Sequence, residues 1–272
     1  MGTAASVAII AVLAGRPAIM EADLVDYQAS QACYGEGALT SREAAFMRLL
    51  EAALAEPAMT KAGASPIVEA DLKKDAERID KETRAPEILA CVKAHFGGDA
   101  ARYRRVFVRT HLAEARLRDF LIHDAAVQGP VRLKAHKTAA QARTGSTLAA
   151  AASAFGLTYT SATYSTEPSI NAQAADRGEF QASFIQDVLT GMATGQLTAE
   201  PVEGAYDLKV IRLLSVAGPR WTFESASIRK RSQEEWFASL PKMRLEVRDR
   251  AIFSWLSGIR GNPRLAAVDL TP

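Results

Sequence analysis

The chain has 272 residues, of which 48% are apolar and 24% are charged, a composition typical of a globular protein with one large or two small domains. Its 33 basic and 31 acidic residues leave a net charge of +2, which gives no broad field to attract nucleic acid or an anionic membrane. We therefore expect no nucleic-acid partner.

The two cysteines, Cys33 and Cys91, have neither C-x-x-C nor metal-ligand spacing, so they define neither a zinc site nor a disulfide framework. They could pair in an oxidising compartment, but we expect two buried, unpaired small residues. The four histidines are scattered and form no metal-binding motif. We expect no metal and no cofactor.

The N-terminal apolar run, residues 4–15, contains no Lys or Arg before Arg16. It is too short to span a bilayer as a helix and lacks the basic segment of a usual signal peptide. It is either the remnant of an export signal or a buried strand. We favour a strand over residues 7–13 that ends at a turn over residues 15–17.

Helices are predicted to follow this strand. A capping box, in which Thr40 accepts a hydrogen bond from the Glu43 amide, begins an amphipathic helix that reaches Leu54. Residues 57–66 are predicted to form a loop, and residues 67–85 a charged helix with a solvated face.

Two further helices are marked by their end signals. Pro86 begins a helix that runs to residue 94 and is terminated by the glycine pair at residues 97–98. Asp99 then caps a long helix over residues 100–124. Four of its arginines fall at intervals that place them on one stripe, and we expect them to cover apolar surface and stay solvated rather than contact a partner. They are Arg102, Arg105, Arg109 and Arg116.

The clearest domain boundary is the Gln-Gly-Pro run at residues 128–130. Residues 131–136 then alternate like an edge strand that ends on His136. The alanine-rich residues 138–155 predict a helix weakened at Gly145, and residues 169–176 predict a polar loop.

Residues 191–214 predict a helix end, a stop at Gly195, a turn near Gly204 and a strand from Tyr206. A Gly-Pro pair at residues 218–219 marks a return to the first domain.

The C-terminal part contains two further elements. Ser232 and Glu235 form a second capping box, which begins a short helix. Residues 242–249 alternate as a strand.

Residues 191–214, with Gly195, Pro201, Val202 and Tyr206 in that order, resemble the end of a parvulin-type peptidyl-prolyl isomerase domain. Residues 155–165 resemble a helix of the same domain, and residues 177–180 occupy the place of its Gly-Gly pair.

The first part of the chain shows a second resemblance. Residues 11–24 resemble the opening of the helical chaperone module of SurA-like and trigger-factor-like foldases, and residues 97–117 resemble its long helix. The chain as a whole thus resembles the SurA/PrsA-like foldases.

The resemblance implies an α+β fold. A SurA-like helical chaperone domain is built from both chain ends, with an inserted, small parvulin-like α/β-sheet domain. The expected parts are a helical domain over residues 1–128, a parvulin-like domain over residues 129–217, and residues 218–272 packing back on the helical domain.

The resemblance also implies the site. His136 matches the histidine of the family's first strand, and Asp207 stands where a second histidine is usual, so these two are the expected catalytic residues. Phe184, Met192 and Tyr206 are the expected substrate-binding residues. A structural role is the alternative for each: an ordinary exposed histidine, a polar residue at a strand end, or plain core.

We therefore expect an exported foldase, periplasmic or membrane-associated, that binds unfolded or extended polypeptides without ATP or another cofactor. Because one histidine is replaced and no cysteine lies in residues 130–216, the isomerase is expected to be weak or inactive. One alternative is a competent peptidyl-prolyl cis-trans isomerase. Another is a non-catalytic assembly protein with one dedicated partner.

Overall fold

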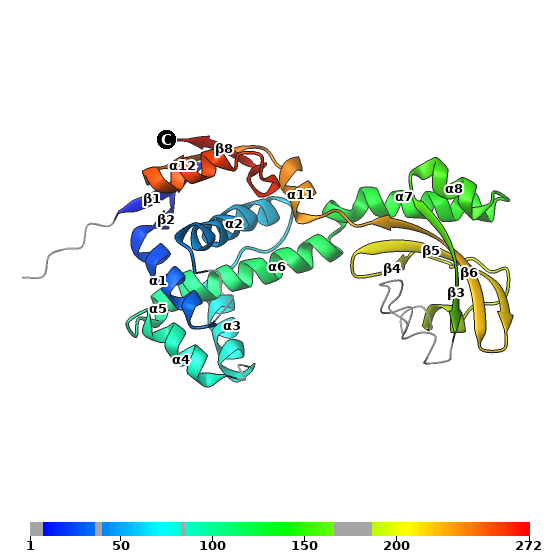
Figure 1. Ribbon diagram of the computed structural model, residues 1–272, viewed down its shortest axis with the longest axis horizontal. Helices are drawn as coiled ribbons and strands as arrows, with labels where there is room; N and C mark the ends of the chain where they lie inside the picture. Colours follow the sequence, from blue (N-terminus) through cyan, green and yellow to red (C-terminus); the bar gives the residue numbers. More distant parts are fainter. Residues whose placement is uncertain (1–7, 36–39, 83–84, 166–186) are drawn as a thin grey trace, which may run out of the picture. The chain divides into compact units, whose positions relative to one another are not determined.

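The computed structural model describes residues 8–35, 40–82, 85–165 and 187–272 (Figure 1). The chain forms two compact units: unit 1 consists of Met1–Leu121 with Ser232–Pro272, and unit 2 consists of Ile122–Arg231. Each unit combines helices with a four-stranded sheet. The α+β class is confirmed, while the unit boundaries differ from those expected at residues 128 and 217.

The sheet of unit 1 joins the two ends of the chain. Its order is β2 (Arg16–Met20), β1 (Ile9–Leu13), β7 (Met243–Val247) and β8 (Val268–Thr271). Strand β1 runs antiparallel to both neighbours, and β7 runs parallel to β8. The strands predicted near both ends of the chain are thus confirmed, and they pair directly with each other.

The β1–β2 hairpin turns at Ala14 and Gly15, which have φ angles of 48° and 80°. Two successive positive φ values are those of a type I′ turn, whose twist matches that of the flanking strands. Pro17 was expected in the turn but lies within β2. That position is tolerated because β2 is the outer strand of its sheet, where a missing N–H is not needed for pairing.

Most of unit 1 is helical. Its helical elements are α1 (Glu21–Ala32), α2 (Arg42–Lys61), α3 (Glu69–Glu82), α4 (Pro86–Ala94), α5 (Ala100–Tyr103), the π-helical turn η1 (Arg104–Val108), α6 (Arg109–His123), α11 (Gln233–Ser239), α12 (Arg250–Gly258) and the 3-10 turn η2 (Pro263–Leu265). The bounds of α4 are those predicted, and Asp99 caps the next helix by accepting from the Arg102 amide. The capping box at Ser232 is also confirmed.

Helix α2 differs from its prediction at both ends. Its cap is Ser41, which accepts from the Ala44 amide, one residue later than the predicted Thr40. The helix also continues through Pro57 to Lys61, where a loop was predicted. Met59 lies in this last turn and is buried, so core packing stabilises a helical turn that the proline alone would disfavour.

Arg42, at the start of α2, forms ion pairs with residues from the N-terminal and the C-terminal parts of unit 1. Its guanidinium donates to both carboxylate oxygens of Glu21 at 2.8 and 2.7 Å, and to Asp249 at 2.8 Å. Asp249 also caps α12 by accepting from the Ala251 and Ile252 amides. One side chain thus connects the first turns of α1 and α2 with the N-terminus of α12.

Unit 2 contains α7 (Ala125–Arg143), α8 (Leu148–Phe155), β3 (Thr158–Ser165), β4 (Val202–Glu203), β5 (Asp207–Ala217) and β6 (Arg220–Arg229). The sheet order is β3-β6-β5-β4, with every pair antiparallel. One face packs against α7 and α8 through Leu208, Val210 and Ala226. The opposite face holds a second apolar cluster that includes Ile211 and Leu213.

The predicted strand at residues 131–136 is wrong, and so is the boundary at residues 128–130. Helix α7 runs through Gly129 and Pro130, and the Asp124 side chain caps it by accepting from the Ala126 amide at 2.7 Å. The residues that α7 buries recur at helical spacing. They are Val131, Ala135, Ala139 and Ala142.

Because Gly129 lies within α7, replacing it with alanine should stabilise the fold. An added Cβ at this position meets nothing within 4 Å, and the glycine has no positive φ. We expect Gly129→Ala to raise the free energy of unfolding of unit 2 by about 0.5–1 kcal/mol, since alanine loses less backbone entropy in a helix. Urea denaturation followed by circular dichroism measures this change. A loss of stability would contradict a continuous helix at this residue.

Two further expectations for unit 2 are corrected. The Gly-Pro pair at residues 218–219 forms the turn between β5 and β6, where Ala217 lies opposite Arg220, and is not an exit from the domain. Residues 155–165, expected as helix, form only the end of α8 before Gly156 takes a φ of 74° and β3 begins. The run of threonines and tyrosines in β3 favours a strand.

Candidate functional site

A groove with a volume of about 830 Å³ lies beside strand β2 in unit 1. We call it the β2 groove; it is formed by β2, by Leu49, Ala53 and Pro57 of α2, and by Val106 of η1. These side chains give it an apolar floor. The small side chain of Ala53 leaves room there for side chains of a bound molecule.

Strand β2 supplies one wall of the groove, and it is an outer strand of its sheet. An outer strand presents backbone groups that an extended peptide can pair with, while a neighbouring apolar surface receives that peptide's side chains. Pro17 lacks an amide donor, so pairing at that residue would rely on its carbonyl. The arrangement suits the binding of an extended polypeptide.

Four of the charged side chains that line the groove are held in ion pairs, and Arg16 of β2 is exposed. Arg109 donates two hydrogen bonds to Glu56, at 2.6 and 2.9 Å, and Arg105 lies 3.4 Å from Asp23. The arginines of the predicted stripe thus stay partly exposed, as expected, with the Arg105 side chain 58% exposed, but they also form ion pairs that the sequence did not predict. Arg102 pairs with Asp26 at 2.6 Å and Arg116 with Asp71 at 2.9 Å, so all four arginines pair with acidic residues of neighbouring helices.

The predicted catalytic residues lie on different elements of unit 2. His136 is exposed on α7, and its Nδ1 lies 3.2 Å from the Glu200 carboxylate. Asp207 begins β5 and accepts a hydrogen bond from the Lys209 ammonium at 2.6 Å. Each residue is paired with another partner, and the strand expected to carry His136 is a helix.

The predicted substrate-binding residues are likewise separated. Tyr206 is adjacent to Asp207 and 79% exposed, with its carbonyl accepting from the Lys230 amide. Met192 packs against the cluster of Ile211 and Leu213, on the face of the sheet opposite α7 and His136. Phe184 lies outside the described residues, as do the predicted loop at residues 169–176 and the place of the Gly-Gly pair. Of the described four, the structure brings together only Tyr206 and Asp207.

A charged cluster that the sequence analysis missed lies nearby in unit 2. The Lys230 ammonium, whose side chain is only 4% exposed, lies 2.8 Å from the Glu203 carboxylate. Arg132 of α7 reaches the same carboxylate at 2.9 Å. Burial raises the pKa of Glu203, but the Lys230 hydrogen bond and the positive charges of Lys230 and Arg132 outweigh it and hold that pKa below its usual value.

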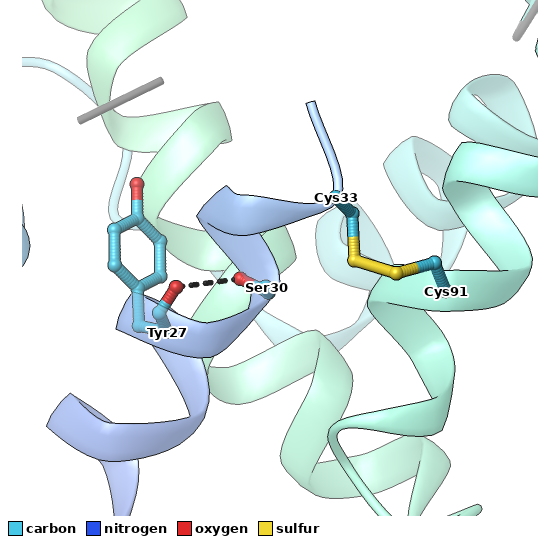
Figure 2. Close-up of a disulfide and its surroundings, with 4 residues drawn as sticks. All are labelled: Tyr27, Ser30, Cys33 and Cys91. Atoms are coloured by element: carbon cyan, nitrogen blue, oxygen red, sulfur yellow. Dashed lines mark hydrogen bonds between the residues drawn. A yellow bond between two sulfur atoms is a disulfide. The ribbon is translucent and has the colours of Figure 1, made fainter. Parts of the chain in front are cut away.

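The prediction of two unpaired cysteines is wrong. Cys33, at the C-terminal end of α1, and Cys91, within α4, form a disulfide with their Cα atoms 5.9 Å apart (Figure 2). On the preceding turn of α1, the Ser30 hydroxyl donates to the Tyr27 carbonyl at 2.7 Å. The two cysteines are 58 residues apart, and no local pattern in the sequence shows that α1 and α4 are neighbours.

Within residues 8–35, 40–82, 85–165 and 187–272, one group of side chains has the spacing of a metal site: Cys33, Cys91 and His95. Over the same ranges, no helix combines the length and the apolar character that crossing a membrane requires.

Comparisons of the chain with models of protein families, with curated proteins and with solved structures find no match.

Proposed function

We propose that the chain is an exported foldase of the SurA/PrsA-like class that binds extended or unfolded polypeptides in the β2 groove. Unit 1 is the helical chaperone part, built from both ends of the chain, and unit 2 is an inserted parvulin-like domain with weak or absent isomerase activity. The observation that carries the proposal is a groove of about 830 Å³, lined by both apolar and ion-paired side chains, beside an outer strand.

Binding in this groove needs neither ATP nor a cofactor. Backbone hydrogen bonds to β2 are available to any extended sequence, while the floor at Leu49, Ala53 and Val106 favours apolar side chains. Such a combination recognises the unfolded state, which exposes both backbone and apolar groups, over a folded protein. The affinity would depend little on the client's exact sequence.

Two observations support the remaining parts of the proposal. His136 is paired with Glu200 and lies across the sheet from Met192, which favours a binding role for unit 2 over prolyl isomerisation. The Cys33–Cys91 disulfide favours an oxidising compartment, because structural disulfides are rare in the cytosol.

The test places an arginine in the floor of the groove. We expect Ala53→Arg to weaken binding of a fluorescent unfolded client at least tenfold, because the long side chain fills the groove and places a charge where the client's apolar side chains would bind. Ala140→Arg on the exposed side of α7 is the matched control and should bind like wild type. Equal affinity of Ala53→Arg and wild type, with both folded, would refute the groove as the binding site.

The same preparations separate the alternatives. In a prolyl isomerisation assay on short Xaa-Pro peptides, we expect little or no acceleration by wild type, and no change in His136→Ala. Acceleration that is lost in His136→Ala would instead establish a competent isomerase. Binding of two unrelated unfolded clients is expected; selective binding of one folded protein would favour the dedicated assembly partner.

A further inference from the structure

We propose that Cys33, Cys91 and His95 form a zinc site when the disulfide is reduced. The two sulfurs and a ring nitrogen of His95 all lie within 4.8 Å of one another. This inference concerns a different part of unit 1 from the β2 groove and does not depend on client binding. In the oxidised protein the site cannot form, because the sulfurs are bonded to each other.

The backbone already holds the three residues at suitable positions. Cys91 and His95 are four residues apart at the end of α4, so they project from the same face of that helix. Cys33 is the C-terminal cap of α1 and is bonded to Cys91 (Figure 2). A tetrahedral zinc ion with Zn–S bonds of about 2.3 Å holds two thiolates about 3.8 Å apart, a separation that side-chain rotation reaches once the S–S bond is broken.

The site can be reached from solvent. Cys91 and His95 are exposed, so that a reductant and a metal ion can both reach the site. Two thiolates and a neutral imidazole leave one position of a tetrahedral zinc ion for water, as in other three-ligand zinc sites.

The change from disulfide to metal site is a two-electron reduction followed by ligand exchange. A thiolate of a small dithiol attacks one cysteine sulfur and forms a mixed disulfide, and the second thiol of the reductant then closes its own disulfide. The two electrons and two protons end on Cys33 and Cys91, which become thiols. Zn²⁺ then displaces the two thiol protons into solvent, while His95 donates a ring-nitrogen lone pair.

The full chain, reduced with a phosphine under argon, tests the proposal with Co²⁺ and Zn²⁺ as probes. We expect one equivalent of Co²⁺ to give the visible absorption of a tetrahedral thiolate site, and the oxidised protein to give none. His95→Ala should bind at least tenfold more weakly, since even the loss of a residue that supports a ligand costs 10–100-fold. His123→Ala, an exposed histidine of unit 2, is the matched control.

Thermal unfolding of the reduced protein distinguishes metal binding by the folded state from metal binding by an unfolded chain. Zn²⁺ should raise the melting temperature of reduced wild type and of His123→Ala, but not that of reduced His95→Ala, because only a site in the folded state stabilises it. Absence of stoichiometric Co²⁺ binding, equal binding by the oxidised protein, or no rise in melting temperature would each overturn the proposal.

Discussion

Replacing both cysteines with serine should cost unit 1 about 4 kcal/mol of its free energy of unfolding. The Cys33–Cys91 disulfide closes a loop over a sequence separation of 58 residues, and the loss of chain entropy in the unfolded state for a loop of that length corresponds to about 4 kcal/mol at 25 °C. Urea denaturation followed by the fluorescence of Trp236 and Trp255, both in unit 1, measures the change.

The control is reduced wild type in metal-free buffer, which should lose about as much stability as the double serine variant. The denaturant dependence should also be steeper in both, because an unfolded chain without the cross-link is more expanded and exposes more surface. A loss below about 1 kcal/mol would show that unit 1 does not depend on the cross-link.

This stabilisation acts on the segment that forms the floor of the β2 groove. The loop between the two cysteines includes α2, which contributes Leu49 and Ala53 to the groove, and α3. Most stability of helices in proteins comes from packing rather than from intrinsic propensity. We therefore expect loss of the disulfide to weaken the groove by loosening α2 rather than through a change at the groove itself.

Helices that begin at a capping residue or a proline could be predicted from the sequence. Pro86, Asp99 and Ser232 mark helix starts where the structure has them, because each residue satisfies or tolerates an unpaired backbone group at a helix N-terminus. The strands near the two chain ends could also be predicted from their apolar and alternating patterns. Their pairing could not, since it depends on the whole chain between them.

Helix α7 shows why a local pattern can mislead. Val131, Leu133 and Ala135 alternate with polar residues, which predicts a strand over six residues. In the structure Leu133 is 55% exposed, and the core contacts come from Val131 and Ala135, one helical turn apart. Gly129 and Pro130 also favour the wrong prediction, because glycine and proline usually mark the boundaries of helices, strands and domains. The helical period becomes clear only when residues 125–143 are considered together.

The candidate site was the least predictable part. The β2 groove takes its walls from β2, α2 and η1, and no single stretch of sequence shows that these come together. The same holds for the pairs Cys33–Cys91 and Glu203–Lys230, which are separated by 58 and 27 residues. A resemblance carried by short motifs points instead to His136 and Asp207, and each of these residues is paired with another partner in the structure.

Removing the negative charge at Glu203 should destabilise unit 2 by about 3 kcal/mol. The variant Glu203→Gln keeps the shape of the side chain but leaves the Lys230 ammonium, 4% exposed, without a carboxylate partner, and breaking one side of a buried ion pair costs about 3–5 kcal/mol. The expected loss lies at the lower end of this range because Glu203 is 33% exposed, so water can replace part of the lost interaction. Hydrogen exchange of the β6 amides reports the stability of this unit.

Two variants separate the charge effect from general damage. Glu200→Gln removes a carboxylate three residues earlier that is 76% exposed and should change stability by less than about 0.5 kcal/mol. Adding Lys230→Met to Glu203→Gln should restore most of the lost stability, because an apolar side chain of similar length needs no counter-ion. If the double variant is no more stable than Glu203→Gln, the buried charge is not the cause.

The same pair predicts an acid dependence. Glu203 has a folded-state pKa below its ordinary value of 4.5, so ionised Glu203 stabilises the folded state fully above that pH. As the pH falls below 4.5 and through the lower folded pKa, the carboxylate takes up a proton and this contribution is lost. The stability difference between wild type and Glu203→Gln should therefore be constant near neutral pH and shrink in acid. A difference that grows as the pH falls would contradict the pairing of Glu203 with Lys230.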